Sequence, residues 1–293
     1  MKKIIFKGCG TAISTPFNES GVNFEEFGKL IEYQIKNEVD SIIVCGTTGE
    51  SSTMTKKEKE DTIFYAIKKV NGRIPVIAGT GGNCTASVIE MTKFAEKVGA
   101  DAALIVTPYY NKTTQDGLVA HYSAIAKETN LPIILYSVPS RTGVNILPET
   151  CKKLSEIPNI VAIKEASGNI SQVAEIANLC GDNLNIYSGN DDQIVPILSL
   201  GGLGVISVLS NIAPKFTHDM VKDYFEGNIN ESKNKQLKCI NLVKALFSEV
   251  NPIPVKAALN IMGYDYGVPR LPLIPMSETK KKILQEEMKK FFV

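Results

Sequence analysis

The segment IVAIKEASGN at positions 160–169 carries a cation at the end of an apolar run. If residues 160–164 form a strand, their side chains alternate between two faces, and Lys164 closes one of them. A buried ammonium group must be paired, lose its proton or face a cavity, and desolvation lowers the pKa of a lysine. A neutral lysine can attack a carbonyl carbon and form an imine. Taken alone, Lys164 is more simply interpreted as a lysine that extends to solvent from a strand end. The residues around it must therefore show whether its amine has a catalytic role.

Hydroxyl groups follow another apolar segment. Thr47 and Thr48 lie between glycines in GTTGES at 46–51. Glycines let the backbone come close to a ligand, so N–H and hydroxyl groups of this turn could bind a small carboxylate. A simple glycine turn explains the same pattern equally well.

Two further residues extend the pattern in YSVPSRTG at 136–143. Tyr136 ends the apolar segment before that of Lys164, and a phenol beside an imine-forming lysine can pass protons. The planar guanidinium of Arg141 suits a carboxylate. In isolation the tyrosine fits core filler and the arginine fits a surface charge. Together with Lys164 they predict imine chemistry on a keto acid, as in a metal-independent aldolase or related lyase.

Eight apolar segments that each precede a helix-like segment must position these residues. Their starts recur about every 20–35 residues, which is typical of a (β/α)8 TIM barrel. Continuous apolar runs suit parallel strands covered on both faces. A doubly wound sheet is the alternative, but GTGGNC at 79–84 lacks the third glycine of a dinucleotide fingerprint. We therefore predict a TIM barrel with strands at 9–13, 41–45, 75–78, 103–106, 132–136, 160–164, 184–187 and 204–208.

The strand signals stop after about residue 225, and the rest of the chain has a helical pattern broken by prolines. We predict a barrel catalytic domain at 1–225 and a C-terminal helical domain at 226–293. The predicted C-terminal helices cover 228–250, 253–262 and 277–293. Asn23, and the capping-box spacing of Thr55 and Glu58, mark two helix starts in the barrel.

Composition excludes several classes of protein. Net charge is +1 over 293 residues with both signs interspersed, so we expect no nucleic-acid or membrane partner. The six scattered cysteines predict reduced, buried thiols. The two histidines are far apart, so we expect no histidine-rich metal site and no His-based triad. We predict no metal and no cofactor, because the iminium would serve as the electron sink. No apolar run reaches membrane-spanning length and no signal-peptide core is present, so we expect a soluble, cytoplasmic protein.

GTTGE at 46–50, YSVPSRTG at 136–143 and IKEASG at 163–168 strongly resemble the dihydrodipicolinate synthase family. The resemblance covers nearly the whole chain and implies a TIM barrel with a C-terminal helical region. It also implies condensation of pyruvate with L-aspartate 4-semialdehyde to 4-hydroxy-tetrahydrodipicolinate, in the diaminopimelate route to lysine. The first and third motifs are shared with N-acetylneuraminate lyase and keto-deoxy sugar acid aldolases. The turn at 140–143 is the more specific motif, because it resembles the site for the semialdehyde carboxylate.

The resemblance assigns catalytic roles by position. Lys164 forms the imine with pyruvate. Thr48, Tyr136 and Tyr110 form a proton relay, with Tyr110 reaching in from a neighbouring subunit. A tyrosine that acts in a neighbouring subunit implies at least a dimer, and the resemblance implies a homotetramer, arranged as a dimer of dimers.

The resemblance also assigns substrate-binding roles. Thr47 and Thr48 hold the pyruvate carboxylate, and Arg141 binds the carboxylate of the second substrate. Gly189 and Ile206 line the site through their backbones.

Two departures from the family pattern stand out. Ser137 replaces the usual asparagine, and we expect activity to survive this change. In lysine-inhibited members, histidines and a glutamate bind lysine at a subunit interface, where this chain has Lys56, Lys59 and Ser87. The pocket then offers two cations and no carboxylate to an incoming ammonium group, so we predict weak or absent inhibition by lysine. Other residues of that pocket are retained, namely Ser51, Asn83 and Tyr109.

The sequence leaves two alternative functions open. A sister aldolase acting on a sugar-derived aldehyde or on sialic acid would share Lys164 and Tyr136 but would not need Arg141. A catalytically silent protein that binds small acids could use the same scaffold, because fold alone does not fix function. Such a protein would have no need of a nucleophile.

Overall fold

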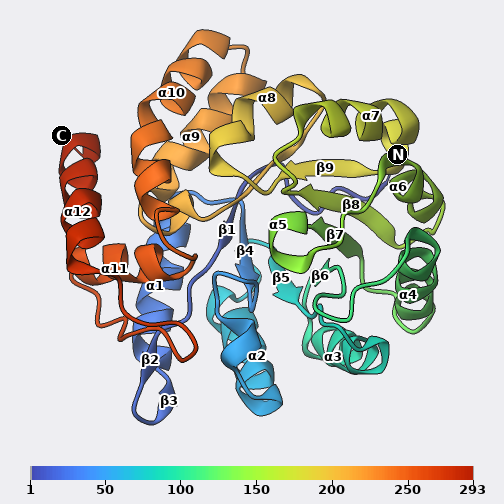
Figure 1. The fold of residues 1–293 in the computed structure, drawn as a ribbon, viewed down its shortest axis with the longest axis horizontal. Coiled ribbons are helices and arrows are strands. Elements are labelled where there is room, and N and C mark those ends of the chain that lie inside the picture. The colour runs from blue at the N-terminus through green and yellow to red at the C-terminus, as the bar shows by residue number, and fades with distance from the viewer. Residues whose placement is uncertain (1, 293) are drawn as a thin grey trace.

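The computed structural model describes residues 2–292 and has a closed barrel of eight parallel strands at its centre (Figure 1). The strands follow the order β1-β10-β9-β8-β7-β6-β5-β4 around the barrel. The predicted TIM barrel is confirmed, and each predicted strand boundary lies within one residue of the observed one. The strands are β1 (Gly8–Ala12), β4 (Ser41–Val44), β5 (Val76–Gly79), β6 (Ala102–Val106), β7 (Ile133–Ser137), β8 (Ile160–Glu165), β9 (Asn185–Ser188) and β10 (Gly204–Ser207). A small hairpin of β2 (Phe17–Asn18) and β3 (Gly21–Val22) was not predicted.

Helices surround the barrel, as the connections between parallel strands require. The Asn23 side chain accepts a hydrogen bond from the Glu26 N–H, and Thr55 and Glu58 form a complete capping box, so both predicted helix starts are confirmed. A short helix is inserted directly after β7 and lies in front of the strands in Figure 1: α5 (Pro139–Thr142). The others are α1 (Phe24–Lys36), α2 (Lys56–Val70), α3 (Thr85–Val98), α4 (Gln115–Lys127), α6 (Pro148–Ser155), α7 (Ile170–Cys180), α8 (Ile194–Ser199) and α9 (Pro214–Phe225).

The barrel interior is closed at the end where the strands begin. Phe6, just before β1, stacks on Tyr187 of β9 with ring centroids 4.4 Å apart. The Tyr187 hydroxyl donates a hydrogen bond to the Phe6 carbonyl at 2.5 Å. Aliphatic side chains such as Ile43, Ile77 and Ile134 belong to the same apolar cluster inside the barrel. The polar residues at the C-terminal ends of the strands lie at the opposite end of the barrel, where TIM barrels carry their active sites.

Three helices follow the barrel, α10 (Ile229–Leu246), α11 (Ile253–Ile261) and α12 (Glu278–Phe292), and Figure 1 shows them gathered along one side of it. Their buried side chains, including Leu242 and Leu284, belong to the same apolar cluster that joins the strands to the barrel helices. This burial holds the C-terminal segment on the barrel without a linker.

All six cysteines are free, and Cys84 is exposed while the other five are buried. The prediction of buried thiols is therefore wrong for Cys84, which precedes α3 as its N-terminal capping residue rather than lying within an apolar segment. Within residues 2–292, no helix combines the length and the apolar character that a bilayer crossing requires.

Candidate active site

Lys164 and Tyr136 lie beside each other inside the barrel, as predicted. The β7–β8 register pairs them directly, and they are 5% and 6% exposed. The Lys164 Nζ atom lies 4.3 Å from the centroid of the Tyr136 ring. Gly189 leaves room for the lysine, because a Cβ atom there would be 3.1 Å from Lys164 Cε and 2.6 Å from Ala166 Cβ. The absence of a side chain at Gly189 thus shapes the surroundings of the amine.

A buried carboxylate follows β9, the strand that pairs with the strand of Lys164. Asp191 is 2% exposed and accepts a hydrogen bond from Ser207 Oγ at 2.5 Å. Its other oxygen accepts from the backbone N–H groups of Val208 and Leu209 at 3.0 and 2.9 Å. Burial raises the pKa of Asp191, against the opposing effect of these hydrogen bonds and of the positive charge on Lys164. We did not predict a role for Asp191, although its place just after β9 is a signal for one.

A cavity of about 420 Å³ opens among the segments that follow β4, β5, β6 and β7. Thr47, Tyr110 and Arg141 line it, so the structure brings these three predicted residues together. Val106 also lines the cavity and pairs with Tyr136 in the barrel register. The cavity therefore extends to the strand end next to Tyr136.

Asn251, for which no role was predicted, joins Thr48 and Arg141. The Asn251 side chain donates a hydrogen bond to Thr48 Oγ1 at 3.0 Å. The Arg141 guanidinium donates to the backbone carbonyl of Asn251 at 3.3 Å. Its only sequence signal is the Asn-Pro dipeptide ahead of α11.

The predicted relay of hydroxyl groups is not assembled within one copy of the chain. Among residues 2–292, no hydrogen bond joins the hydroxyls of Thr48, Tyr136 and Tyr110, and that of Thr48 accepts from Asn251 instead. The Tyr110 side chain is 91% exposed and its backbone has a left-handed φ of 69°. Ile206 is fully buried in β10, with its backbone beside Gly10.

This geometry has a counterpart in known proteins. The model of the Dihydrodipicolinate synthetase family matches residues 5–291. The chain belongs to this family. A 4-hydroxy-tetrahydrodipicolinate synthase of Clostridium perfringens is 58% identical over 285 residues, which cover 97% of this chain and 98% of that protein.

Solved structures of the dihydrodipicolinate synthase family share the whole fold. The enzyme from Thermotoga maritima superposes with a TM-score of 0.96 at 45% identity, covering 99% of each chain. A structure described as the first monomeric dihydrodipicolinate synthase variant also has a TM-score of 0.96 at 45% identity, covering 98% of this chain and 97% of that one. The family therefore includes at least one variant that is described as monomeric.

Ser137, one of the two expected departures from the family pattern, lies outside the candidate site. It follows Tyr136 in β7, so its side chain points to the helices rather than into the barrel. Its hydroxyl donates to Asn145 at 3.0 Å, and the Asn145 amide donates to Gln172 at 2.6 Å. Gln172 in turn donates to Glu165 at 2.9 Å, and burial raises the pKa of this carboxyl. The serine thus belongs to a polar network between strands and helices.

A second cavity, of about 280 Å³, gathers the residues that the family resemblance assigns to lysine binding. Its lining also includes Glu90, whose carboxylate forms an ion pair with Lys56. The expectation that the pocket offers no carboxylate is therefore wrong. Glu90 lies three residues after Ser87 on α3, so the two side chains share one helix face. Residues from the predicted pocket that line this cavity are Ser51, Lys56, Lys59, Asn83, Ser87 and Tyr109.

Within residues 2–292, one group of potential metal-ligating side chains comes together, formed by Glu38, His218 and Asp219. Lys215 pairs with Glu38 at 2.9 Å and with Asp219 at 2.5 Å. His218 Nδ1 lies 2.9 Å from the carboxylate of Asp40, the residue before β4. The group therefore lies at the end of the barrel away from Lys164 and forms an ion-pair network.

Proposed function

We propose that this chain condenses pyruvate with L-aspartate 4-semialdehyde to give 4-hydroxy-tetrahydrodipicolinate for lysine biosynthesis through diaminopimelate. The observation that carries this proposal is the direct contact of Lys164 with Tyr136 beside the cavity that holds Arg141. The names of its relatives support the choice of substrates.

The reaction begins when the neutral Lys164 amine attacks the keto carbon of pyruvate. Loss of water gives the iminium, which withdraws electrons from the neighbouring methyl group. Loss of a methyl proton gives the enamine, whose carbon attacks the aldehyde carbon and forms the new carbon–carbon bond. The aldehyde oxygen takes up a proton and becomes the hydroxyl group. The amino group of the second substrate then displaces Lys164, which closes the ring and frees the enzyme.

Tyr136 is the group placed to move protons in these steps, because its ring already contacts the Lys164 amine. Thr47 and Thr48 hold the pyruvate carboxylate at the glycine turn. Arg141 holds the carboxylate of the semialdehyde with its planar pair of donors. The backbones of Gly189 and Ile206 complete the site. Asp191 is proposed to assist, because its carboxyl accepts three hydrogen bonds that favour the charged form, and a negative charge near Lys164 favours the iminium over the neutral imine.

Tyr110 enters the site of a neighbouring subunit in this proposal, and the active form is a homotetramer. The support is the 91% exposure of a large aromatic side chain at the rim of the cavity, together with the family resemblance. The division into a barrel domain, 1–225, and a C-terminal domain, 226–293, also belongs to the proposal. So does a cytoplasmic location, which the biosynthetic names of the relatives support.

Borohydride reduction in the presence of pyruvate tests the central step. The native chain is expected to gain one reduced pyruvyl group on Lys164, identified by mass spectrometry of the intact chain and its peptides. Lys164→Arg and a sample without pyruvate are the controls. A folded native chain that gains no adduct would overturn the aldolase proposal and favour a protein that only binds small acids.

A further inference from the structure

Asn251 joins two groups of the proposed site although it is distant from both in the sequence. Its side-chain nitrogen donates to Thr48 Oγ1 at 3.0 Å, across 203 positions of the chain. Its backbone carbonyl accepts from Arg141 at 3.3 Å. Asn251 is 5% exposed, so water does not readily replace either bond. One residue of the C-terminal segment thus contacts both the loop that carries Thr48 and the short helix α5 that carries Arg141.

The bond from Asn251 restricts the hydroxyl group of Thr48. A threonine hydroxyl has one hydrogen to donate and two lone pairs that accept. Because Asn251 occupies one lone pair, the O–H bond of Thr48 points away from Asn251. The hydrogen and the second lone pair remain free for partners in the site. A group that passes a proton must both donate and accept in this way.

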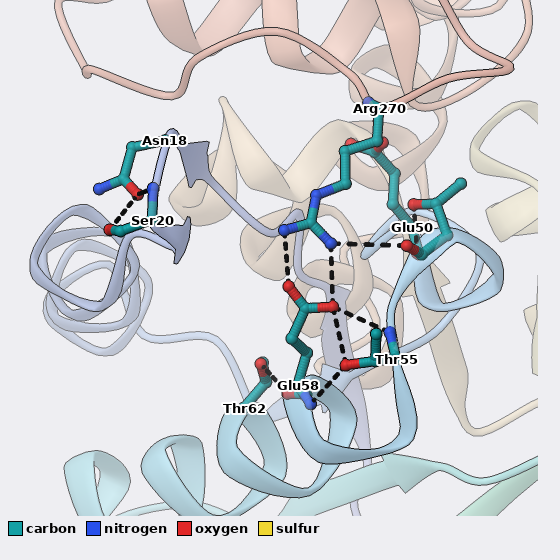
Figure 2. A network of polar contacts seen from close by, with 8 residues as sticks. Asn18, Ser20, Glu50, Thr55, Glu58, Thr62 and Arg270 are labelled. Atoms are coloured by element: carbon teal, nitrogen blue, oxygen red, sulfur yellow. Dashed lines mark hydrogen bonds and ion pairs between the residues drawn. The ribbon is translucent and has the colours of Figure 1, made fainter.

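Two ion pairs fix the C-terminal segment, one against the loop that carries Thr48 and one against α2, which follows that loop. Lys256, in α11, pairs with Glu50 at 2.6 Å, and both side chains are buried. The Arg270 backbone N–H donates to the other oxygen of Glu50 at 2.9 Å. Figure 2 shows the Arg270 guanidinium reaching Glu58 beside the Thr55 cap, with two bonds of 3.0 and 2.6 Å. Thr48 therefore lies in a loop whose distance from α11 is fixed.

We propose that Asn251 is a positioning residue that orients the Thr48 hydroxyl for proton transfer in the condensation. The inference rests on the proposed function, because Asn251 acts only through the role of Thr48. The Arg141 contact uses the backbone carbonyl of Asn251, and an alanine at this position keeps that carbonyl. Replacing the Asn251 side chain by alanine therefore removes the bond to Thr48 and keeps the bond from Arg141.

The test is a double-mutant cycle of Asn251→Ala and Thr48→Val. Asn251→Ala is expected to lower kcat by roughly 10- to 100-fold, since small losses of alignment have effects of this size. The KM for the semialdehyde should stay within about three-fold of the native value, because Arg141 keeps its contact. In the Thr48→Val background, Asn251→Ala should cause no further loss, because the two residues act as one unit. Imine trapping with pyruvate shows whether a variant that is too slow for the turnover assay still forms the adduct on Lys164.

Asn260→Ala is the matched control, because Asn260 belongs to the same C-terminal segment, near the end of α11. Within residues 2–292 its side chain bonds to Gly267 and Tyr266, away from the site. It is expected to keep the native kcat. If Asn251→Ala lowers the melting temperature by more than the control does, the near-isosteric Asn251→Asp replaces it. An aspartate only accepts, so it draws the Thr48 hydrogen away from the site and should lower kcat at least as much.

Each outcome has a separate meaning. A native chain without a pyruvate adduct overturns the proposed function and this inference with it. A native chain that turns over, with an Asn251→Ala variant of native kcat, overturns only this inference. Equal losses in the native and Thr48→Val backgrounds also overturn it, since they show that Asn251 acts independently of Thr48.

Discussion

Lys256 and Glu50 form an ion pair with a distance of 2.6 Å and side-chain exposures of 1% and 0%. It joins the C-terminal segment to the loop that carries Thr48. Burial lowers the pKa of Lys256, against the opposing effect of the Glu50 carboxylate. Lys256→Met leaves that carboxylate without its counter-ion, and we expect the free energy of unfolding to fall by about 3–5 kcal/mol. Denaturant unfolding measures the change.

The matched control is Lys57→Met, which breaks the exposed pair of Lys57 with Asp61. Exposed pairs contribute about 0–1 kcal/mol, so this variant should unfold almost like the native chain. The double variant Glu50→Gln with Lys256→Met removes both charges and should regain part of the loss. Equal stability of the Lys256→Met and Lys57→Met variants would show that the buried pair contributes nothing.

Arg141→Ala should separate the two substrates. The guanidinium is proposed to bind only the semialdehyde, so the KM for this substrate should rise by roughly 10- to 100-fold, as expected when a charged contact is lost. The rate of pyruvate adduct formation on Lys164 should change less than about three-fold. Arg73→Ala, which removes an arginine paired with Glu32 on the surface, is the control. Equal loss of both steps would contradict the assignment of Arg141.

Tyr110 can be tested by mixing two inactive variants. Lys164→Ala lacks the amine, and Tyr110→Phe lacks the relay hydroxyl. If Tyr110 acts in the neighbouring subunit, mixed oligomers contain sites with a native Lys164 and a native Tyr110. Such mixtures, made by unfolding and refolding the two together, should recover activity that neither variant has. Sedimentation measures the assembly, and a monomer with full turnover would remove Tyr110 from the relay.

His218 should make stability depend on pH. Its hydrogen bond with Asp40 raises the pKa of the imidazole, against the opposing effect of burial, with Asp219 and Lys215 nearby. A raised folded-state pKa stabilises the fold below the unfolded value of about 6.5. This stabilisation is lost as pH rises through the folded value. His218→Asn should therefore lower the melting temperature more at about pH 5.5 than at about pH 9.

His121 provides the opposite sign as a control. Burial lowers the pKa of its imidazole, so the native residue costs stability as pH falls below about 6.5. The melting temperature of His121→Gln, relative to that of the native chain, should be higher at acidic pH than at alkaline pH. Parallel pH profiles of the two variants would contradict the assigned contacts.

Lysine should inhibit the chain weakly or not at all. An incoming ammonium group would meet the cations of Lys56 and Lys59, and the carboxylate of Glu90 is already paired with Lys56. L-lysine at about 1 mM is expected to change initial rates less than two-fold, and inhibition at about micromolar lysine would contradict this. Lys56→Ala frees Glu90 and should increase the sensitivity to lysine.

The proximity of Lys164 and Tyr136 could be predicted from the sequence, because both end apolar segments that follow each other in the chain. In a TIM barrel, consecutive strands are neighbours and their C-terminal ends share one rim. Strand alternation then places both side chains inside. Glu90 was missed for a different reason. Glu90 lines the second cavity because one face of α3 turns toward α2. The spacing of apolar residues along α3 does not by itself predict that orientation.

The sequence by itself determined the barrel, its strands, the amine and the residues at the strand ends, because these follow from local periodicity and from the closure of a βα repeat. Only the tertiary structure decided which residues of the C-terminal helices reach the site. The bond from Asn251 to Thr48 spans 203 positions and the bond from Lys256 to Glu50 spans 206. No repeat relates such positions. They meet because the apolar faces of α10, α11 and α12 pack on the barrel in one arrangement, and that arrangement places α11 beside the loop after β4.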